Sequence, residues 1–365
     1  MDRPVTFVGM DLGTFRTTVV SSNGKRAEVE TTVGWPKDHI ARSVLGRDVL
    51  FGKEVIEQRM ALNYIRPFAK GALKYNDHEQ CGVSAEQLER HKEAAKLLVK
   101  HAVSLIEPSE GHAIYGVVGC PSRASVANKE LIMEATRDAF DAVMLAPEPF
   151  AVAYSSNQLT DALIVDIGAG TIDLCPMFGT FPQEEDQFTI PFGGDAIDEE
   201  FYQLISELYP EARISMRMAR QIKEKSGFVH DGNDQVFVTL PVNGKPREFD
   251  VTQPLKQACS RIVLPIVDGI GQLISRYDPE IQCSLLSNIV LGGGGSQLKG
   301  LDQVLEEALQ AYGGGSVTKV YDSVFAGAVG ALKIAMNMPT DCWEQITKLE
   351  SDRTTKAVPR RQKVA

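Results

Sequence analysis

Residues 162–173 read ALIVDIGAGTID, an apolar stretch that enters a glycine-containing turn and leaves it through a second apolar stretch. Residues 5–21 repeat this arrangement, because VTFVGM runs into Asp11-Leu12-Gly13-Thr14 and TTVVS follows. Each copy predicts two strands joined by an Asp-x-Gly turn. The copies stand about 155 residues apart, and this internal repeat predicts two similarly built halves.

Both turns carry groups that suit phosphate. A glycine lets the backbone approach a phosphate closely, and its amides are anion donors. Thr14 and Thr171 add a hydroxyl donor, while Asp11 and Asp166 stand at strand ends, where a carboxylate can hold Mg²⁺, usually through its waters. One such turn alone is more often an ordinary hairpin, but two after apolar strands favour a clamp on the β- and γ-phosphates.

A third glycine-rich segment follows the apolar strand 289–291, where four glycines precede Ser296 and a helix is expected from about residue 300. A flexible loop is the alternative. Linkers do not usually follow a buried strand directly, however, and glycine-rich turns before helices suit nucleotides. We therefore favour nucleotide binding for this segment.

The segment 219–225 places Arg220, Lys223 and Glu224 at i, i+3 and i+4, so they share one helix face. Taken alone, this pattern is best interpreted as a solvated surface face.

Strands alternate with helices along the rest of the chain, which predicts α/β architecture. Helices are expected near 85–106, 124–140, 150–156 and 323–336, and strands over 113–118 and 162–165. Ser84 and Gln87 form a capping box for the first of these helices, and Asn23-Gly24 predicts a hairpin turn. The small residues of 326–331 suit close packing on a sheet. Residues 33–74 look less regular.

The composition limits the function further. A length of 365 residues predicts about two domains, and the net charge of −10 argues against a general binder of nucleic acid or anionic membranes. No apolar stretch approaches the roughly 20 residues that span a bilayer, and the N-terminal residues show no signal-peptide h-region, so we expect a cytoplasmic protein. The six cysteines form no CxxC pair and predict buried free thiols, and the histidines show no zinc pattern.

Together these motifs resemble those of the actin, Hsp70 and sugar-kinase superfamily. Residues 11–14 resemble its first phosphate motif, 166–173 its second and 291–296 its adenosine motif, while the segments that begin at Val117 and Phe325 match its connecting helices. The resemblance implies an α/β actin-like ATPase fold, with two RNase H-like domains and a nucleotide cleft between them. Domain I would span 1–150, with a subdomain at about 33–74 and a completing helix at about 322–345. Domain II would span 151–321, with a subdomain at about 191–254, and 346–365 would form a disordered basic tail.

Within this superfamily the chain is similar to MreB-like bacterial actins. Residues 222–225 resemble the actin helix that touches the ribose and adenine, and 192–198 resemble the ribose-side turn of MreB-type proteins. Residues 33–38, 121–129 and 149–150 resemble the branch that organises magnetosome chains. The resemblance implies ATP-dependent polymerisation into cytoplasmic filaments, with ATP or ADP and Mg²⁺ as cofactors. It also implies self-association and magnetosome-associated adaptor proteins as partners, with no nucleic acid and no direct membrane insertion.

The resemblance assigns roles residue by residue. Glu148 would position the attacking water and Asp166 would support the Mg²⁺ and water network, although a Glu at a helix start also favours the helix dipole. Asp11 and Asp166 would hold Mg²⁺ through water. The implied nucleotide contacts are Asp11, Gly13, Thr14, Phe15, Arg16, Gly168, Gly170, Thr171, Gly193, Gly194, Asp195, Lys223, Glu224, Gly293, Gly294, Gly295 and Ser296.

Two features leave alternatives open. Some superfamily members place a lysine in the first phosphate turn where this chain has Phe15-Arg16, so Arg16 either neutralises phosphate charge or points to solvent. A non-polymerising ATPase or a small-molecule kinase of the same superfamily is the alternative function. A chaperone would need a peptide-binding domain, and only about 30 residues follow the last expected helix.

Overall fold

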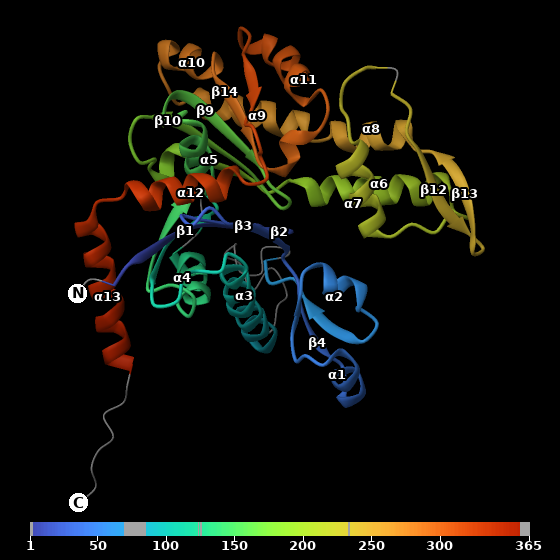
Figure 1. Ribbon diagram of the computed structural model, residues 1–365. Helices are drawn as coiled ribbons and strands as arrows, with labels where there is room; N and C mark the ends of the chain where they lie inside the picture. Colours follow the sequence, from blue (N-terminus) through green and yellow to red (C-terminus); the bar gives the residue numbers. More distant parts are fainter. Residues whose placement is uncertain (1–2, 69–84, 123, 125, 233, 358–365) are drawn as a thin grey trace, which may run out of the picture. The chain divides into compact units, whose positions relative to one another are not determined.

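The computed structural model describes residues 3–68, 85–122, 124, 126–232 and 234–357 (Figure 1). The chain divides into two compact units. Unit 1 comprises Met1–Cys120, Ala124–Ala146 and Ala328–Ala365, and unit 2 comprises Pro121–Arg123 and Pro147–Gly327. Each unit is built on a five-stranded mixed sheet.

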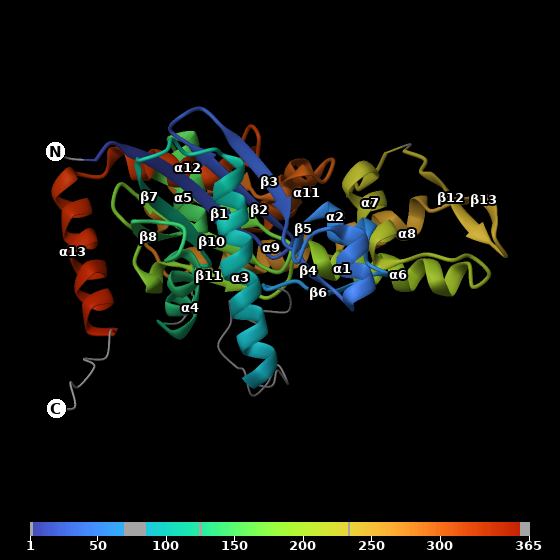
Figure 2. The same cartoon turned by 60° about the horizontal axis from the view of Figure 1, so that its bottom comes forward.

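The sheet of unit 1 has the strand order β3-β2-β1-β7-β8. Its strands are β1 (Val5–Leu12), β2 (Arg16–Ser21), β3 (Arg26–Glu30), β7 (Ala113–Cys120) and β8 (Ala142–Pro147). β1 pairs antiparallel with β2 and parallel with β7. The helices α3 (Ala85–Leu105) and α4 (Val126–Thr136) cover one face, where Leu98 and Val99 join the core with Val8 and Met10 (Figure 2).

The helix α12 (Ala326–Asn337) packs directly on β1, as its small residues predict. A Cβ at Gly9 would lie 2.1 Å from the carbonyl oxygen of Ala328 and 2.2 Å from the amide nitrogen of Leu332. Only glycine allows this approach of a strand to a helix backbone.

The segment that looked irregular from the sequence is a small ordered layer. Its sheet has the order β5-β4-β6, and its elements are β4 (Val33–Pro36), α1 (His39–Leu45), β5 (Leu50–Phe51), α2 (Lys53–Glu57) and β6 (Leu62–Ile65). Leu50, Val55 and Leu62 form its core. Residues 69–74 of the expected subdomain lie outside the described residues, as does Ser84 of the expected capping box.

The sheet of unit 2 has the order β11-β10-β9-β14-β15. Its strands are β9 (Thr160–Ile167), β10 (Ile172–Phe178), β11 (Phe188–Ile190), β14 (Ile289–Gly292) and β15 (Val317–Lys319). Again the first two strands form an antiparallel hairpin, and β14, the other neighbour of β9 in the sheet, runs parallel to it. The repeat read from the two Asp-x-Gly turns is therefore confirmed at the level of topology.

Helices complete unit 2. They are α5 (Glu148–Ser156), α9 (Val263–Ile274), α10 (Pro279–Leu286) and α11 (Leu301–Ala308). The remaining part of this unit contains α6 (Gly194–Leu208), α7 (Met216–Ser226), α8 (Thr252–Ser260) and a hairpin of β12 (Phe237–Val242) with β13 (Lys245–Asp250), which lies beside α6 and α7 in Figure 1.

The expected disordered tail is wrong for residues 346–357, because α13 (Thr340–Ala357) continues through them. Trp343 attaches this helix to unit 1. Its side chain is 2% exposed, its indole Nε1 donates to the carbonyl of Ala335 at 3.2 Å, and its ring stacks on Tyr115 at 5.0 Å. Residues 358–365 lie outside the described residues.

Two further expectations need correction. The helix expected over 124–140 ends at Thr136, and residues 142–147 form β8, the edge strand of the sheet. Of the cysteines, Cys120, Cys175 and Cys259 are buried as expected, whereas Cys283 is exposed. Burial raises the pKa of the Cys259 thiol to about 12, so this group stays protonated at neutral pH. Cys342 is half-buried, and Cys81 lies outside the described residues.

None of the helices in the described part of the chain combines the length and apolar character that a membrane span requires.

Candidate functional site

The turn between β9 and β10 has its carbonyls bonded to the start of α6. The carbonyl of Gly168 accepts from the amide of Gly194 at 3.0 Å, and that of Ala169 accepts from the amide of Asp195 at 2.7 Å. In a trans peptide the N–H points opposite to the C=O, so the amides of Ala169 and Gly170 face away from α6. Neither amide donates a hydrogen bond to another described residue. Successive amides in this arrangement form a concave anion-binding site.

The glycines at the start of α6 allow this contact. A Cβ at Gly193 would lie 2.7 Å from the carbonyl oxygen of Ala169, so any larger residue would push α6 off the turn. The structure thus brings three expected contacts, Gly193, Gly194 and Asp195, to the second turn. Their backbone supports the turn rather than facing solvent.

The hydroxyl of Thr171 has a hydrogen-bond partner within the protein. It donates to the carboxylate of Asp173 at 3.1 Å, and Asp173 also accepts from the hydroxyl of Thr189 at 2.6 Å and from the amide of Ser122 at 3.3 Å. Asp173 is 1% exposed. Thr171 and Asp173 thus join the second turn to β10 and to Thr189 of β11. The spacing of two residues could have suggested this pair, because alternate residues of an extended segment share a face.

The glycine run packs against the end of β9. β14 places Gly292 opposite Asp166. A Cβ at Gly293, where φ is 71°, would lie 2.4 Å from the carbonyl oxygen of Ile167 and 2.5 Å from a carboxylate oxygen of Asp166. A Cβ at Gly295 would lie 2.2 Å from the side chain of Ile167, whereas one at Gly294 would meet no atom of the described residues within 4 Å apart from its chain neighbours.

The alternative of a flexible loop therefore does not hold for residues 292–296. Ser296 is 1% exposed, and its hydroxyl donates to the carbonyl of Gly293 at 2.7 Å. The second turn, Asp166 and the glycine run form one packed group within unit 2.

The interpretation of residues 219–225 as a solvated face is wrong for two of its members. The side chains of Arg220 and Lys223 are 13% and 12% exposed. Both pair with Asp198, which is fully buried, at 2.6 Å and 2.7 Å. Lys223 also donates to the carbonyl of Gly194 at 2.8 Å, while Glu224 is exposed. A buried carboxylate between two cations ties α7 to α6 and so fixes Lys223 beside the second turn.

The first turn, between β1 and β2, repeats the arrangement with different partners. The carbonyl of Gly13 accepts from the hydroxyl of Thr31 at 2.9 Å, and that of Phe15 accepts from the amide of Thr31 at 2.8 Å. The carbonyl of Thr14 accepts from Arg66 at 3.3 Å. By the same peptide geometry, the amides of Thr14 and Phe15 point away from these donors.

Two residues near the first turn have defined surroundings. Gly13 is required by packing, because a Cβ would lie 2.3 Å from the carbonyl oxygen of Arg16. The guanidinium of Arg16 pairs with Glu28 on the adjacent strand at 3.2 Å.

The carboxylates expected to act in hydrolysis lie at element ends. Glu148 is the first residue of α5 and is 9% exposed, at the positive end of the helix dipole. Asp11 stands near the end of β1 in unit 1, and Asp166 near the end of β9 in unit 2. In the described part of the chain, no group of three or more His, Cys, Asp and Glu side chains is placed to hold a metal.

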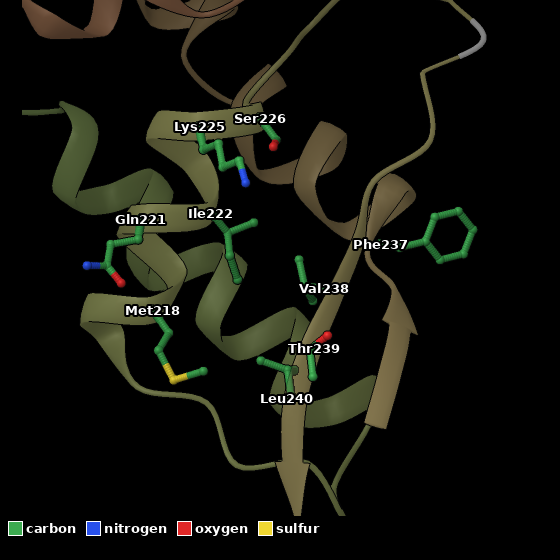
Figure 3. Close-up of a pocket in the computed structure, with 9 residues that line it drawn as sticks. All are labelled: Met218, Gln221, Ile222, Lys225, Ser226, Phe237, Val238, Thr239 and Leu240. Atoms are coloured by element: carbon green, nitrogen blue, oxygen red, sulfur yellow. The ribbon is translucent and has the colours of Figure 1, made fainter. Parts of the chain in front are cut away.

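A cavity of about 390 Å³ lies between α7 and β12 (Figure 3). It is lined by Met218, Gln221, Ile222, Lys225, Ser226, Phe237, Val238, Thr239 and Leu240. None of the expected site residues lines it. It is therefore a separate feature of α7, on a different side from Lys223.

Comparison with known proteins agrees with these motifs. A family model described as MreB/Mbl protein matches residues 82–339. The actin-like protein MamK of Paramagnetospirillum magneticum is 37% identical over 340 residues, which cover 93% of this chain and 95% of MamK.

Solved structures give the same result. A MamK double helical filament matches with a TM-score of 0.84, covering 92% of this chain and 100% of the MamK chain at 37% identity. A non-polymerising MamK mutant bound to AMPPNP matches with a TM-score of 0.69 over the same share of both chains. The resemblance to bacterial actins read from the motifs is thus confirmed: the chain belongs to the MreB/Mbl family and has the actin-like fold.

Proposed function

We propose that this protein is an ATP-dependent bacterial actin that polymerises into cytoplasmic filaments and hydrolyses ATP as the filaments turn over. The observation that carries the proposal is the state of the two Asp-x-Gly turns. Their carbonyls are hydrogen-bonded within the protein, so successive amides at 14–15 and at 169–170 point the other way. Such amides bind phosphate oxygens, and two turns offer donors to two phosphate groups of ATP.

The glycine run supports a ligand beside the second turn. Packing explains why residues 293 and 295 are glycine, but it does not explain Gly294, whose Cβ would enter open space. A glycine without a packing reason is expected where a ligand approaches the backbone closely. We assign this position to the adenosine part of ATP, with Lys223 held nearby by Asp198.

The carboxylates fit Mg²⁺ in the form that it usually takes with nucleotides. Mg²⁺ keeps several waters and binds one or two carboxylates together with phosphate oxygens, so a cage of protein side chains is not needed. Asp11 and Asp166, each at a strand end beside a phosphate-binding turn, would hold it through water. When bound, it would neutralise charge on the β- and γ-phosphates.

Glu148 is the residue that we expect to orient the attacking water. Water attacks the γ-phosphorus, the bond to the ADP oxygen breaks, and a carboxylate that accepts a hydrogen bond from the water keeps it in line. The near-complete burial of Glu148 at the start of α5 limits its movement. In this chemistry the protein contributes mainly position and electrostatics.

The filament and its cellular role rest on the relatives. MamK, at 37% identity over most of both chains, forms a double helical filament, and its non-polymerising mutant binds AMPPNP. We propose that this chain likewise assembles with copies of itself, and that adaptor proteins connect its filaments to magnetosome chains.

The test is pelleting and negative-stain microscopy of the purified protein with ATP, with ADP and without nucleotide, with phosphate release followed in parallel. The Glu148→Ala variant is run beside the wild type. We expect filaments that depend on ATP in both proteins, and phosphate release that falls by roughly 100-fold in the variant, within the range for loss of a residue that positions a reacting group.

The outcomes separate the alternatives. Filaments without any phosphate release would support a scaffold that binds ATP without hydrolysing it. Phosphate release without filaments, at concentrations well above micromolar, would support a non-polymerising ATPase. An unchanged rate in Glu148→Ala would remove Glu148 from the mechanism.

A further inference from the structure

A cationic side chain from the small layer of residues 33–65 reaches the first turn. Arg66 directly follows β6 and donates from a terminal guanidinium nitrogen to the carbonyl of Thr14 at 3.3 Å. Its guanidinium carbon lies 5.5 Å from the centre of the Phe15 ring. No local sequence pattern indicates this contact, because the two residues stand 52 positions apart.

The arginine that follows the first turn, at the start of β2, pairs with a carboxylate on the neighbouring strand. Arg16, which the sequence left either near phosphate or in solvent, pairs with Glu28 of β3 at 3.2 Å. Arg66 contacts both turn residues that precede Arg16, Thr14 through its carbonyl and Phe15 through its ring.

The backbone on both sides of Arg66 is held in place. Before it, Ile65 pairs with Val33 in the small sheet. After it, the carbonyl of Pro67 is hydrogen-bonded to His91 of α3 at 3.0 Å, and Phe68 is 1% exposed. The fixed backbone sets where the Arg66 side chain begins, and its contacts with Thr14 and Phe15 set where it ends, so Arg66 is suited to position its neighbours.

We propose that Arg66 is the positioning residue of the first phosphate turn. By holding the carbonyl of Thr14, it fixes the peptide between Thr14 and Phe15 so that its amide points to a phosphate oxygen. Its positive charge near the turn also attracts the anionic phosphates. This inference rests on the proposed function, and it adds a link between the nucleotide and residues 33–65.

The alternative is that Arg66 only braces the fold. Two ligands distinguish these roles, because adenosine lacks phosphate and ATP carries it. Loss of a residue that only stabilises the fold should lower the affinity for both ligands alike. Loss of a residue that positions the phosphate turn should lower the affinity for ATP alone.

The experiment measures the Kd of ATP, ADP and adenosine by calorimetry on the full chain, below the protein concentration at which the wild type pellets. The first variant is Arg66→Met, which keeps much of the side-chain length but removes the charge and the hydrogen-bond donors. The second is Arg66→Lys, which keeps the charge but loses the planar set of guanidinium donors. Arg59→Met is the control, because Arg59 is an exposed arginine that donates to the carbonyl of Ile56 at 3.0 Å in the same small layer. Circular dichroism checks that each variant is folded.

We expect Arg66→Met to raise the Kd of ATP and ADP by about 10-fold or more, which is the effect of losing a charged hydrogen-bond partner. The Kd of adenosine should rise by less than about twofold. Arg66→Lys should lie between Arg66→Met and the wild type for ATP, and Arg59→Met should match the wild type.

Two results would overturn the inference alone. These are an unchanged ATP affinity in Arg66→Met, or an adenosine affinity that falls as far as that of ATP. If Arg66→Met does not fold, the same comparison of ATP with adenosine in Arg66→Lys decides. Wild-type protein that binds none of the three ligands would instead overturn the proposed function and this inference with it.

Discussion

Adjacent glycines in the run after β14 have different reasons to be glycine. Gly293 has a φ of 71°, and an added Cβ would lie 2.4 Å from a backbone oxygen, whereas Gly294 has neither constraint. The fold therefore demands glycine at one position, and we assign the demand at the other to the ligand.

This difference predicts opposite behaviour for two alanine variants. Gly293→Ala should lower the free energy of unfolding by about 1–3 kcal/mol, because it adds backbone strain and a clash with Ile167. Gly294→Ala should leave the free energy of unfolding within about 0.5 kcal/mol of the wild type and weaken ATP binding. Urea unfolding by circular dichroism and the Kd for ATP measure the two effects. Equal losses of stability in both variants would contradict the assignment.

At this scale the sequence predicted the residues of local turns and missed their distant partners. Asp11, Gly13 and Gly168 follow from short motifs whose chemistry lies within a few residues. Asp198 and Arg66 act on residues 25 and 52 positions away, and no local pattern encodes such a distance.

Helices and strands were predictable from the sequence where the periodic pattern of apolar residues extends over many positions. The strands β1, β7 and β9 and the helix α3 have such periods, whereas β5 has two residues and α2 has five, which is too short to show one. The strand β8 was hidden because its apolar run follows a helix of mixed character. Residues 346–357 of α13 were mistaken for part of a disordered tail because most of them are polar, and the attachment of this helix depends mainly on Trp343.

The attachment of α13 can be tested by truncating that one side chain. Trp343→Ala removes a buried ring, its stacking on Tyr115 and a hydrogen bond, and should lower the free energy of unfolding by about 3 kcal/mol. Leu349→Ala, on the same helix but 62% exposed, should change it by less than about 0.5 kcal/mol. Urea unfolding, followed by far-ultraviolet circular dichroism because it does not need the tryptophan signal, compares the free energies of unfolding of the two variants. If both variants match the wild type, α13 does not depend on this contact.

The architecture of the whole chain was predictable because the same local pattern occurs twice. In each sheet the strand before the Asp-x-Gly turn pairs antiparallel with the strand after the turn and parallel with a strand from much later in the chain, β7 or β14. The pattern did not predict which residues tie the turns to their surroundings. Thr31 and Arg66 serve the first turn, and the start of α6 serves the second, so equivalent turns are supported by unrelated elements.

Net charge is a property of the whole molecule that bears on its assembly. The chain carries −10, so copies that we propose to assemble must approach one another against repulsion. The distance over which exposed charges act falls from about 30 Å at 0.01 M salt to about 8 Å at 0.15 M. Raising KCl from about 0.01 M to about 0.15 M, at fixed ATP and Mg²⁺, should therefore lower the critical concentration for pelleting by roughly two- to fivefold. Running the same series with Glu148→Ala separates assembly from hydrolysis, because screening should act equally on both proteins. A critical concentration that rises with KCl in both would mean that attractive ion pairs between subunits outweigh the repulsion of the net charge.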